Sequence, residues 1–213
     1  MPLARRAESL GVALLAGGQA SRYGGRRKGL LEIAPGLSLL QHLIGQLRLC
    51  GLGEIVLLAN DSDPYHALGL PILPDLRFGC GPLAGMEAGL HHYLGRYAAT
   101  LFLPCDLPGL TALEITRLAE AFLEGEAGVA TCATEASVQP LCAVVDQRLL
   151  SAIQEALDAG ERSPRRLWRQ LGAEEVPFAD PAPFFNLNCP ADLAEWIARR
   201  DHRGLPQCAP EPA

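Results

Sequence analysis

The sequence lacks the features of a membrane-spanning or nucleic-acid-binding protein. No apolar run approaches the roughly 18 to 20 residues that a membrane span requires. Lys and Arg number 18 against 24 Asp and Glu, which gives a formal net charge of −6. An acidic chain has no overall attraction to nucleic acid or to an anionic membrane. We therefore expect neither as a partner, and basic residues should matter only locally.

Patterns typical of zinc sites and disulfide frameworks are absent as well. The seven cysteines are odd in number and scattered, without a C-x-x-C pair, and a reducing cytosol fits this best. The five histidines include no H-x-x-x-H pair, and the neighbours His91 and His92 would point in different directions on a helix. The apolar stretch 10–16 is short for a secretion signal and runs into glycines. We expect a cytoplasmic protein.

Length and composition favour one globular domain. The chain has 213 residues, of which 49% are hydrophobic and 20% are charged, close to the average for globular proteins. A domain of this length buries a substantial core. We expect it to span residues 1–200, because the segment 201–213 is rich in proline, lacks periodicity and is predicted to be a disordered tail.

Apolar runs of strand length alternate with segments of helical periodicity. Strands are expected at residues 11–16, 54–59, 71–73, 100–104, 129–134 and 141–145. Helices are expected where Leu39, Leu40, Leu43, Ile44 and Leu47 share a face, at 64–69, 82–94, around Leu113, Leu118 and Phe122, and at 148–159, 164–171 and 190–199. The alternation predicts an α/β fold with a single doubly wound, mostly parallel sheet, which binds ligands beyond the carboxyl ends of its strands.

A glycine-rich loop follows the first expected strand, at residues 17–29. Gly17 and Gly18 remove side chains that would block a base or a phosphate, and the backbone N–H groups of such a loop can bind an anion. Arg22 and Lys28 add positive charge for a triphosphate. The loop contains neither G-K-[ST] nor G-x-G-x-x-G, which argues against a P-loop kinase and a Rossmann dehydrogenase. An ordinary turn with solvated basic residues is the alternative interpretation.

Polar residues also follow the next three expected strands. These are Asn60, Asp75 and Asp106. Asp106 comes after a buried apolar run, so its carboxylate should emerge at the sheet edge, where it could hold Mg²⁺ against phosphate oxygens. An aspartate at a strand end can instead serve only as a turn residue or helix cap.

Five segments, taken in order, resemble a known family. They are L-A-G-G-x-x-S-R beginning at Leu15 and leading to Lys28, G-P-L-A-G-M at 81–86, P-C-D-x-P at 104–108, Q-P-L at 139–141 and N-x-N-x-P at 186–190. Together they resemble the molybdenum cofactor guanylyltransferases, which are nucleotidyltransferases of the glycosyltransferase-A-like α/β fold. The resemblance covers residues 12 to about 196.

The resemblance implies GTP as substrate and Mg²⁺ as cofactor. It implies that the nucleotide contacts Leu15, Ala16, Gly17, Gly18, Lys28, Asn60, Asp75, Gly81, Pro82, Leu83 and Asp106. Asp106 would hold the metal, and Asp106, Lys28 and Arg22 would carry catalysis. Asn186 and Asn188 would lie on the side where the pterin substrate enters. The family usually has Asp directly before the loop lysine, where this chain has Arg27.

By this resemblance, the phosphate of molybdopterin, or of the molybdenum cofactor, attacks the α-phosphorus of GTP and releases pyrophosphate. Three alternatives remain: a molybdopterin cytidylyltransferase, a sugar-1-phosphate nucleotidyltransferase, and a GTP-binding adaptor that delivers the cofactor without turnover. The adaptor is suggested by Arg27. Cofactor-delivery proteins and molybdoenzymes are the protein partners that the resemblance implies.

Overall fold

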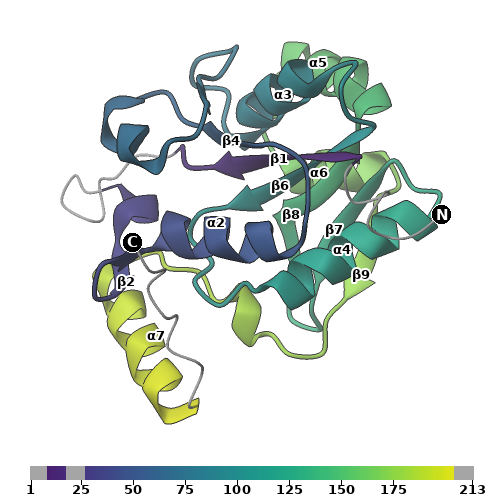
Figure 1. The fold of residues 1–213 in the computed structure, drawn as a ribbon. Coiled ribbons are helices and arrows are strands. Elements are labelled where there is room, and N and C mark those ends of the chain that lie inside the picture. Colours follow the sequence, from purple (N-terminus) through teal and green to yellow (C-terminus); the bar gives the residue numbers. More distant parts are fainter. Residues whose placement is uncertain (1–8, 18–26, 204–213) are drawn as a thin grey trace.

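The computed structural model describes residues 9–17 and 27–203, and its centre is a seven-stranded sheet (Figure 1). The strand order is β5-β4-β1-β6-β8-β7-β9. The strands are β1 (Leu10–Leu15), β4 (Ile55–Leu58), β5 (Ile72–Leu73), β6 (Ala99–Pro104), β7 (Val129–Ala133), β8 (Val138–Asp146) and β9 (Glu174–Pro177). Only β8 runs antiparallel to its neighbours. The predicted α/β class with a mostly parallel sheet is confirmed.

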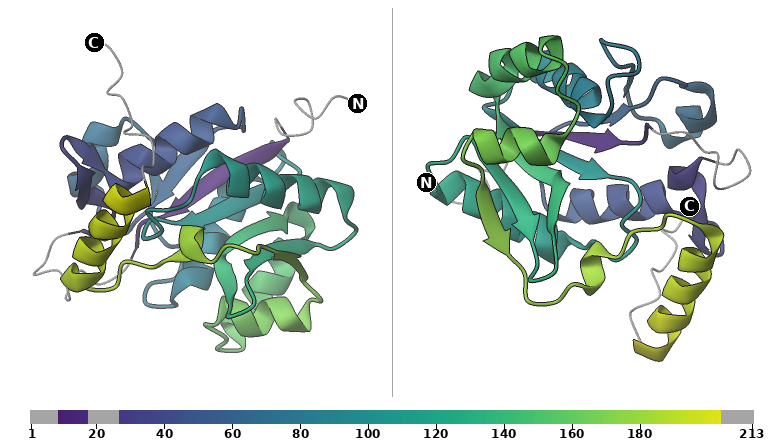
Figure 2. Two further views of the ribbon diagram at one scale, coloured as in Figure 1. Left: turned by 90° about the horizontal axis from the view of Figure 1, so that it is seen from below. Right: turned by 180° about the vertical axis from the view of Figure 1, so that it is seen from behind.

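Helices cover both faces of this sheet (Figures 1 and 2). One face packs against α2 (Leu39–Leu49) and α4 (Ala112–Glu124), and the other against α3 (Pro82–Tyr93), α5 (Leu150–Asp158) and α6 (Pro164–Gln170). The five residues predicted to form the buried face of α2 are all buried. The helix predicted around Leu113, Leu118 and Phe122 is α4, in which Leu118 is buried and Leu113 faces solvent. Leu113 is 73% exposed.

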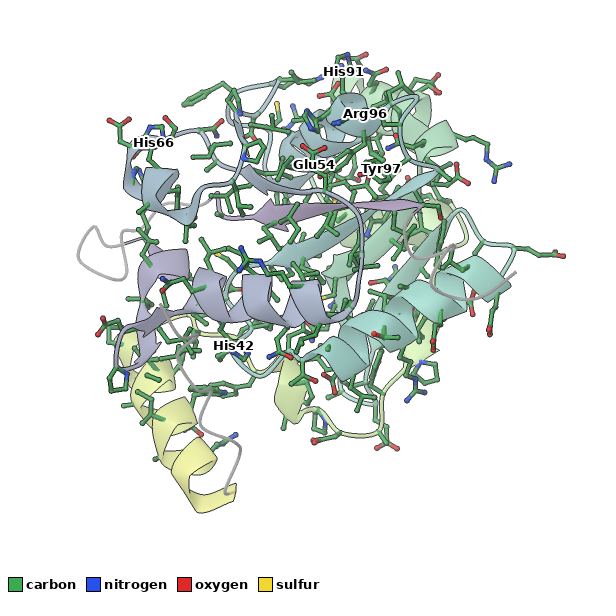
Figure 3. All side chains as sticks on the ribbon, in the orientation of Figure 1. His42, Glu54, His66, His91, Arg96 and Tyr97 are labelled. Atoms are coloured by element: carbon green, nitrogen blue, oxygen red, sulfur yellow. The ribbon has the colours of Figure 1, made fainter. Side chains whose placement is uncertain are left out.

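The amino-terminal edge of the sheet is closed by side chains from the end of α3. The Tyr93 hydroxyl lies 2.9 Å from the carbonyl oxygen of Val12 and 2.6 Å from that of Glu54. Glu54 donates its backbone N–H to the Tyr97 hydroxyl at 3.0 Å and pairs with Arg96 at 2.8 Å. Figure 3 shows the Glu54, Arg96 and Tyr97 side chains gathered there. The opposite, carboxyl-terminal edge is therefore where a ligand can approach.

Several short elements were not predicted. They are a hairpin of β2 (Glu32–Ala34) and β3 (Leu37–Ser38), strand β9, and the 3₁₀ helices η2 (Lys28–Leu30), η4 (Gln147–Leu149) and η5 (Ala182–Phe184). The 64–69 helix is the 3₁₀ helix η3 (Asp63–Leu68). The hairpin strands and β9 are short and contain no continuous apolar run, so their sequence does not mark them as strands.

The carboxyl-terminal helix α7 (Pro190–Arg203) projects from the body of the molecule (Figure 1). It extends past the predicted end at residue 199 and includes the first three residues of the predicted tail, while residues 204–213 lie outside the described chain. Its Leu193 and Trp196 pack on a small apolar cluster of Leu31, Ile33, Leu39 and Leu187. Packing of one helical face supports a helix beyond what local propensity indicates. In residues 9–17 and 27–203 no helix is long and apolar enough to cross a membrane.

Candidate active site

A cavity of about 310 Å³ opens at the carboxyl edge of the sheet. The chain passes from β1 to β4 and β5 on one side and then returns to β6 on the other, so the edge between β1 and β6 is a topological switch point. The cavity is lined by Leu15, Ala16, Gly17, Arg27, Lys28, Leu58, Asn60, Asp75, Gly81, Pro82, Gly85, Pro104, Cys105, Asp106 and Leu141. Residues predicted from strand ends therefore do meet in one place.

One end of the cavity carries an ammonium group and a carboxylate. Lys28 Nζ lies 3.2 Å from Asp106 Oδ2 and 3.2 Å from Asn188 Oδ1. Gly29 allows this approach, because a Cβ there would lie 2.6 Å from a methyl carbon of Leu40. The carbonyl oxygen of Asp106 accepts the N–H of Leu187 at 2.9 Å, which brings the Asn188 segment beside β6. Three segments far apart in sequence thus converge on one cation.

The other end of the cavity holds an amide paired with a carboxylate. Asn60 Nδ2 donates to Asp75 Oδ2 at 2.7 Å, and the Asp75 N–H donates to Asn60 Oδ1 at 2.8 Å. The second carboxylate oxygen, Asp75 Oδ1, has no hydrogen-bond partner among residues 9–17 and 27–203. A Cβ at Gly85 would lie 3.4 Å from that oxygen. Glycine at position 85 therefore keeps the space beside the free acceptor open.

Between the two ends lies the last turn of backbone after β1. The buried Tyr65 hydroxyl of η3 donates to the Ala16 carbonyl at 3.2 Å, and burial raises the pKa of Tyr65 to about 12, so it remains a donor. Among the residues that the structure describes, a Cβ at Gly17 would meet only the Leu58 carbonyl oxygen, at 4.0 Å, which leaves room for a ligand. Burial raises the pKa of Cys105 to about 12, with help from the Asp106 charge. That thiol is a poor nucleophile.

The predicted glycine-rich segment 81–85 is the start of helix α3. Gly81 is its N-cap with φ of +70°, a conformation that favours glycine, and Gly81, Pro82 and Gly85 line the cavity. The free N–H groups of a first helical turn attract anionic and other acceptor groups. The Leu83 side chain does not reach the cavity, because it points into the core and is fully buried. A contact from Leu83 would have to use its backbone N–H.

The site lacks a cage of protein ligands for a metal ion. In the described parts of the chain no group of three or more His, Cys, Asp and Glu side chains comes together. Figure 3 shows His42, His66 and His91 well apart from one another. Of the described carboxylates that line the cavity, Asp106 is the one beside Lys28. Mg²⁺ commonly binds through one or two carboxylates together with substrate phosphates and water, so this donor set fits a divalent ion that arrives with a polyphosphate.

The remaining predicted residues divide into two groups. Asn188 reaches Lys28, whereas Asn186 is half-buried and does not line the cavity. Gly18 and Arg22 lie outside the described residues.

Sequence reasoning missed Arg27, which lines the cavity and forms an ion pair with Asp61. The available signal was that Asp61 directly follows Asn60 at the end of a predicted strand.

Several sequence relatives are named molybdenum cofactor guanylyltransferase. The chain is 33% identical over 192 residues to a molybdenum cofactor guanylyltransferase of Photobacterium profundum, which covers 89% of this chain and 96% of that protein.

Among solved structures, the molybdopterin-guanine dinucleotide biosynthesis protein A of Archaeoglobus fulgidus aligns with a TM-score of 0.74 and 20% identity, over 91% of this chain and all of that one. A 4-diphosphocytidyl-2C-methyl-D-erythritol synthase of Anaerococcus prevotii aligns with a TM-score of 0.75 and 11% identity, over 94% of this chain and all of that one. A Mycobacterium tuberculosis protein solved in complex with manganese aligns with a TM-score of 0.67 and 12% identity, over 89% of this chain and 98% of that one. At such identities these likenesses show the fold alone.

The profile of one family spans most of the sheet and the whole cavity. It is described as the MobA-like NTP transferase domain, and it matches residues 12–176. That range runs from β1 through β9 and includes Lys28, Asn60, Asp75 and Asp106. The chain belongs to the MobA-like NTP transferase family.

Proposed function

We propose that this protein transfers GMP from GTP to the phosphate of molybdopterin, releasing pyrophosphate and forming molybdopterin guanine dinucleotide. The relative of 33% identity bears the name of this activity and matches almost end to end. The observation that carries the proposal is the order of polar groups along the sheet edge. Asp75, Asn60, Gly17 and Asp106 follow the ends of four adjacent strands, β5, β4, β1 and β6.

This order suits a nucleotide lying along the edge. Three steps between adjacent strands amount to about 14 Å, enough for an elongated ligand. The Asn60–Asp75 end would take the base, because a carboxylate there repels phosphate. The end with Lys28 would take the triphosphate, because it supplies positive charge.

We expect the base end to favour guanine over cytosine. Asp75 Oδ1 is an acceptor without a described partner, and guanine offers the N1–H and the N2 amine as neighbouring donors. The corresponding edge of cytosine offers the acceptors N3 and O2 beside a single amine. Guanine can place two neighbouring donors on this carboxylate, whereas cytosine can place one donor with the acceptor N3 beside it, so the site penalises cytosine.

The acceptor phosphate is an anion at neutral pH, so the reaction requires no general base. One of its oxygens attacks the α-phosphorus of GTP while the bond from that phosphorus to the bridging oxygen breaks, and pyrophosphate leaves with the electron pair. The protein holds two polyanions together and offsets their repulsion. Lys28 faces the phosphates, and Asn188 would orient the acceptor beside it, with Asn186 on the same segment.

Asp106 would hold the divalent ion that we propose to be Mg²⁺. When bound, the ion neutralises phosphate charge and favours departure of pyrophosphate. A fold neighbour solved with manganese supports the use of a divalent ion. Arg22 remains a proposed phosphate ligand. We further propose a cytoplasmic enzyme built as one domain over residues 1–200, with cofactor-delivery proteins and molybdoenzymes as its protein partners.

The test is pyrophosphate release with molybdopterin as acceptor and GTP or CTP as donor, in magnesium. We expect turnover with GTP and at most a few per cent of that rate with CTP. Equal rates would contradict the guanylyl assignment, and turnover only with a sugar 1-phosphate would contradict the acceptor. GTP binding without any release would identify an adaptor. Asp75→Asn serves as the matched variant, and we expect it to narrow the difference between GTP and CTP.

A further inference from the structure

Arg27 is a cation of the cavity that the proposed mechanism does not use. It directly precedes Lys28, lines the cavity, and its side chain is 31% exposed. Its guanidinium pairs with the carboxylate of Asp61, which follows Asn60 in the connection after β4. Within residues 9–17 and 27–203, Asp61 is the only hydrogen-bond or ion-pair partner of the Arg27 guanidinium. The neighbouring Lys28, in contrast, is shared by two partners.

The ion pair lies at the carboxyl edge of the sheet near the end of β1, and its Arg27 lines the cavity. The charges of Arg27 and Asp61 both act on the pKa of the Tyr65 hydroxyl, and that hydroxyl donates to Ala16 at the end of β1. β1 stands between β4 and β6 in the sheet. The guanidinium is therefore near the middle of the edge, between Asn60 at the base end and Lys28 at the phosphate end.

The pair is weak enough to exchange. Both side chains are partly solvated, at 31% and 46% exposure, and such surface ion pairs contribute little to stability. A guanidinium binds a phosphate through two parallel hydrogen bonds, and a triphosphate carries several charges where Asp61 carries one. A triphosphate in the cavity would also repel the Asp61 carboxylate. Both effects favour transfer of Arg27 from Asp61 to the nucleotide.

We propose that Arg27 is an additional phosphate-binding residue, which exchanges its ion pair with Asp61 for the triphosphate when the nucleotide binds. The inference rests on the proposed function, since it takes GTP as the ligand. It assigns Asp61 a competing role, so removing Asp61 should help the nucleotide. A purely structural clasp between the two loops predicts the opposite, because either substitution would then break the same contact.

The experiment is isothermal titration of GTP in magnesium, and of guanosine, into the wild-type protein, Arg27→Met, Asp61→Asn and the double variant. We expect Arg27→Met to weaken GTP binding roughly tenfold and to leave guanosine unchanged, since a charge-assisted contact acts on phosphate alone. Asp61→Asn should strengthen GTP binding by roughly twofold to fivefold. The double variant should bind GTP about as weakly as Arg27→Met.

Arg48→Met is the matched control, because it removes one positive charge from an exposed position on α2. We expect it to bind GTP as the wild type does. If Arg27→Met and Arg48→Met bind GTP equally well, the inference falls while the proposed function stands. If both Arg27→Met and Asp61→Asn weaken GTP and guanosine alike, the pair is a structural clasp. Failure of the wild-type protein to bind GTP would instead contradict the proposed function. Melting temperatures of all variants check that each is folded.

Discussion

At the scale of single residues, Lys28 and Asp106 form an ion pair in the candidate site. The ammonium group stands 3.2 Å from the carboxylate, so each neutralises the other. A nucleotide and its divalent ion would supply each with a stronger partner, since the ion meets the carboxylate and the phosphates meet the ammonium. The pair is partly exposed, at 28% and 21%, and breaking it costs little stability.

Asp106→Asn should therefore lose activity and keep its fold. The amide keeps the shape of the side chain and removes the charge for the metal, so we expect turnover to fall by about 10² to 10³ or more. The melting temperature of the nucleotide-free protein should hardly change, because the backbone bond from Leu187 to Asp106 remains. Pyrophosphate release measured across a magnesium series decides this. Near-normal turnover would mean that Asp106 serves only as a turn residue.

At the scale of elements, the connection from β5 to α3 is fixed by an ion pair between its Arg77 and Glu87 of α3. Arg77 Nε lies 3.1 and 3.0 Å from the two carboxylate oxygens of Glu87, whose side chain is almost fully buried. Asp158 at the end of α5 also contacts the Arg77 guanidinium. This connection carries Asp75 at one end and Gly81 at the other, so the pair positions two walls of the cavity.

Arg77→Met should lower the free energy of unfolding by about 3 to 5 kcal/mol, because it leaves the Glu87 carboxylate buried without its counterion. Asp158→Asn is the control, and it should cost under about 1 kcal/mol since that partner is 66% exposed. Urea unfolding measures both. Arg77→Met with Glu87→Gln should recover part of the loss, because the buried charge is then gone. Equal costs for the two single variants would contradict the burial argument.

At the scale of the whole molecule, the residues around the cavity are supported by apolar clusters of unequal size. Two large apolar clusters cover the faces of the sheet, and the small cluster around Leu187 joins the β2–β3 hairpin, the 185–187 segment and α7. Lys28 and Asn188 flank this small cluster in sequence, while Asp75 and Asn60 belong to the large body. A small cluster opens at lower free energy than the main core.

We therefore predict that the hairpin and α7 open locally at a lower free energy than global unfolding requires. In native-state hydrogen exchange, residues 30–38 and 187–199 should exchange faster than β1 and β6, and GTP should slow them because it engages Lys28. Leu187→Ala should cost about 3 kcal/mol in that region, since the side chain is fully buried, without reducing protection in β1 and β6. A uniform loss of protection in the variant would show that the molecule opens as one unit.

The sequence by itself determined the layered α/β fold and much of the cavity. The strands β1, β4 and β6 and the buried face of α2 follow from apolar periodicity, which local sequence carries. Asn60, Asp75 and Asp106 meet in one cavity because each follows a strand, and the carboxyl ends of parallel strands share an edge. Knowledge of the topology was enough to bring them together.

Only the tertiary structure decided the rest. The strands of the hairpin and β9 are two to four residues long, and in β9 only Val176 is buried, so their pairing comes from neighbours and not from a pattern of their own. Contacts across 160 residues, from Lys28 to Asn188, and across 34, from Arg27 to Asp61, leave no local trace. Such contacts depend on how the loops assemble at the carboxyl edge of the sheet, because a charged side chain on a loop pairs with whichever partner the fold brings within reach.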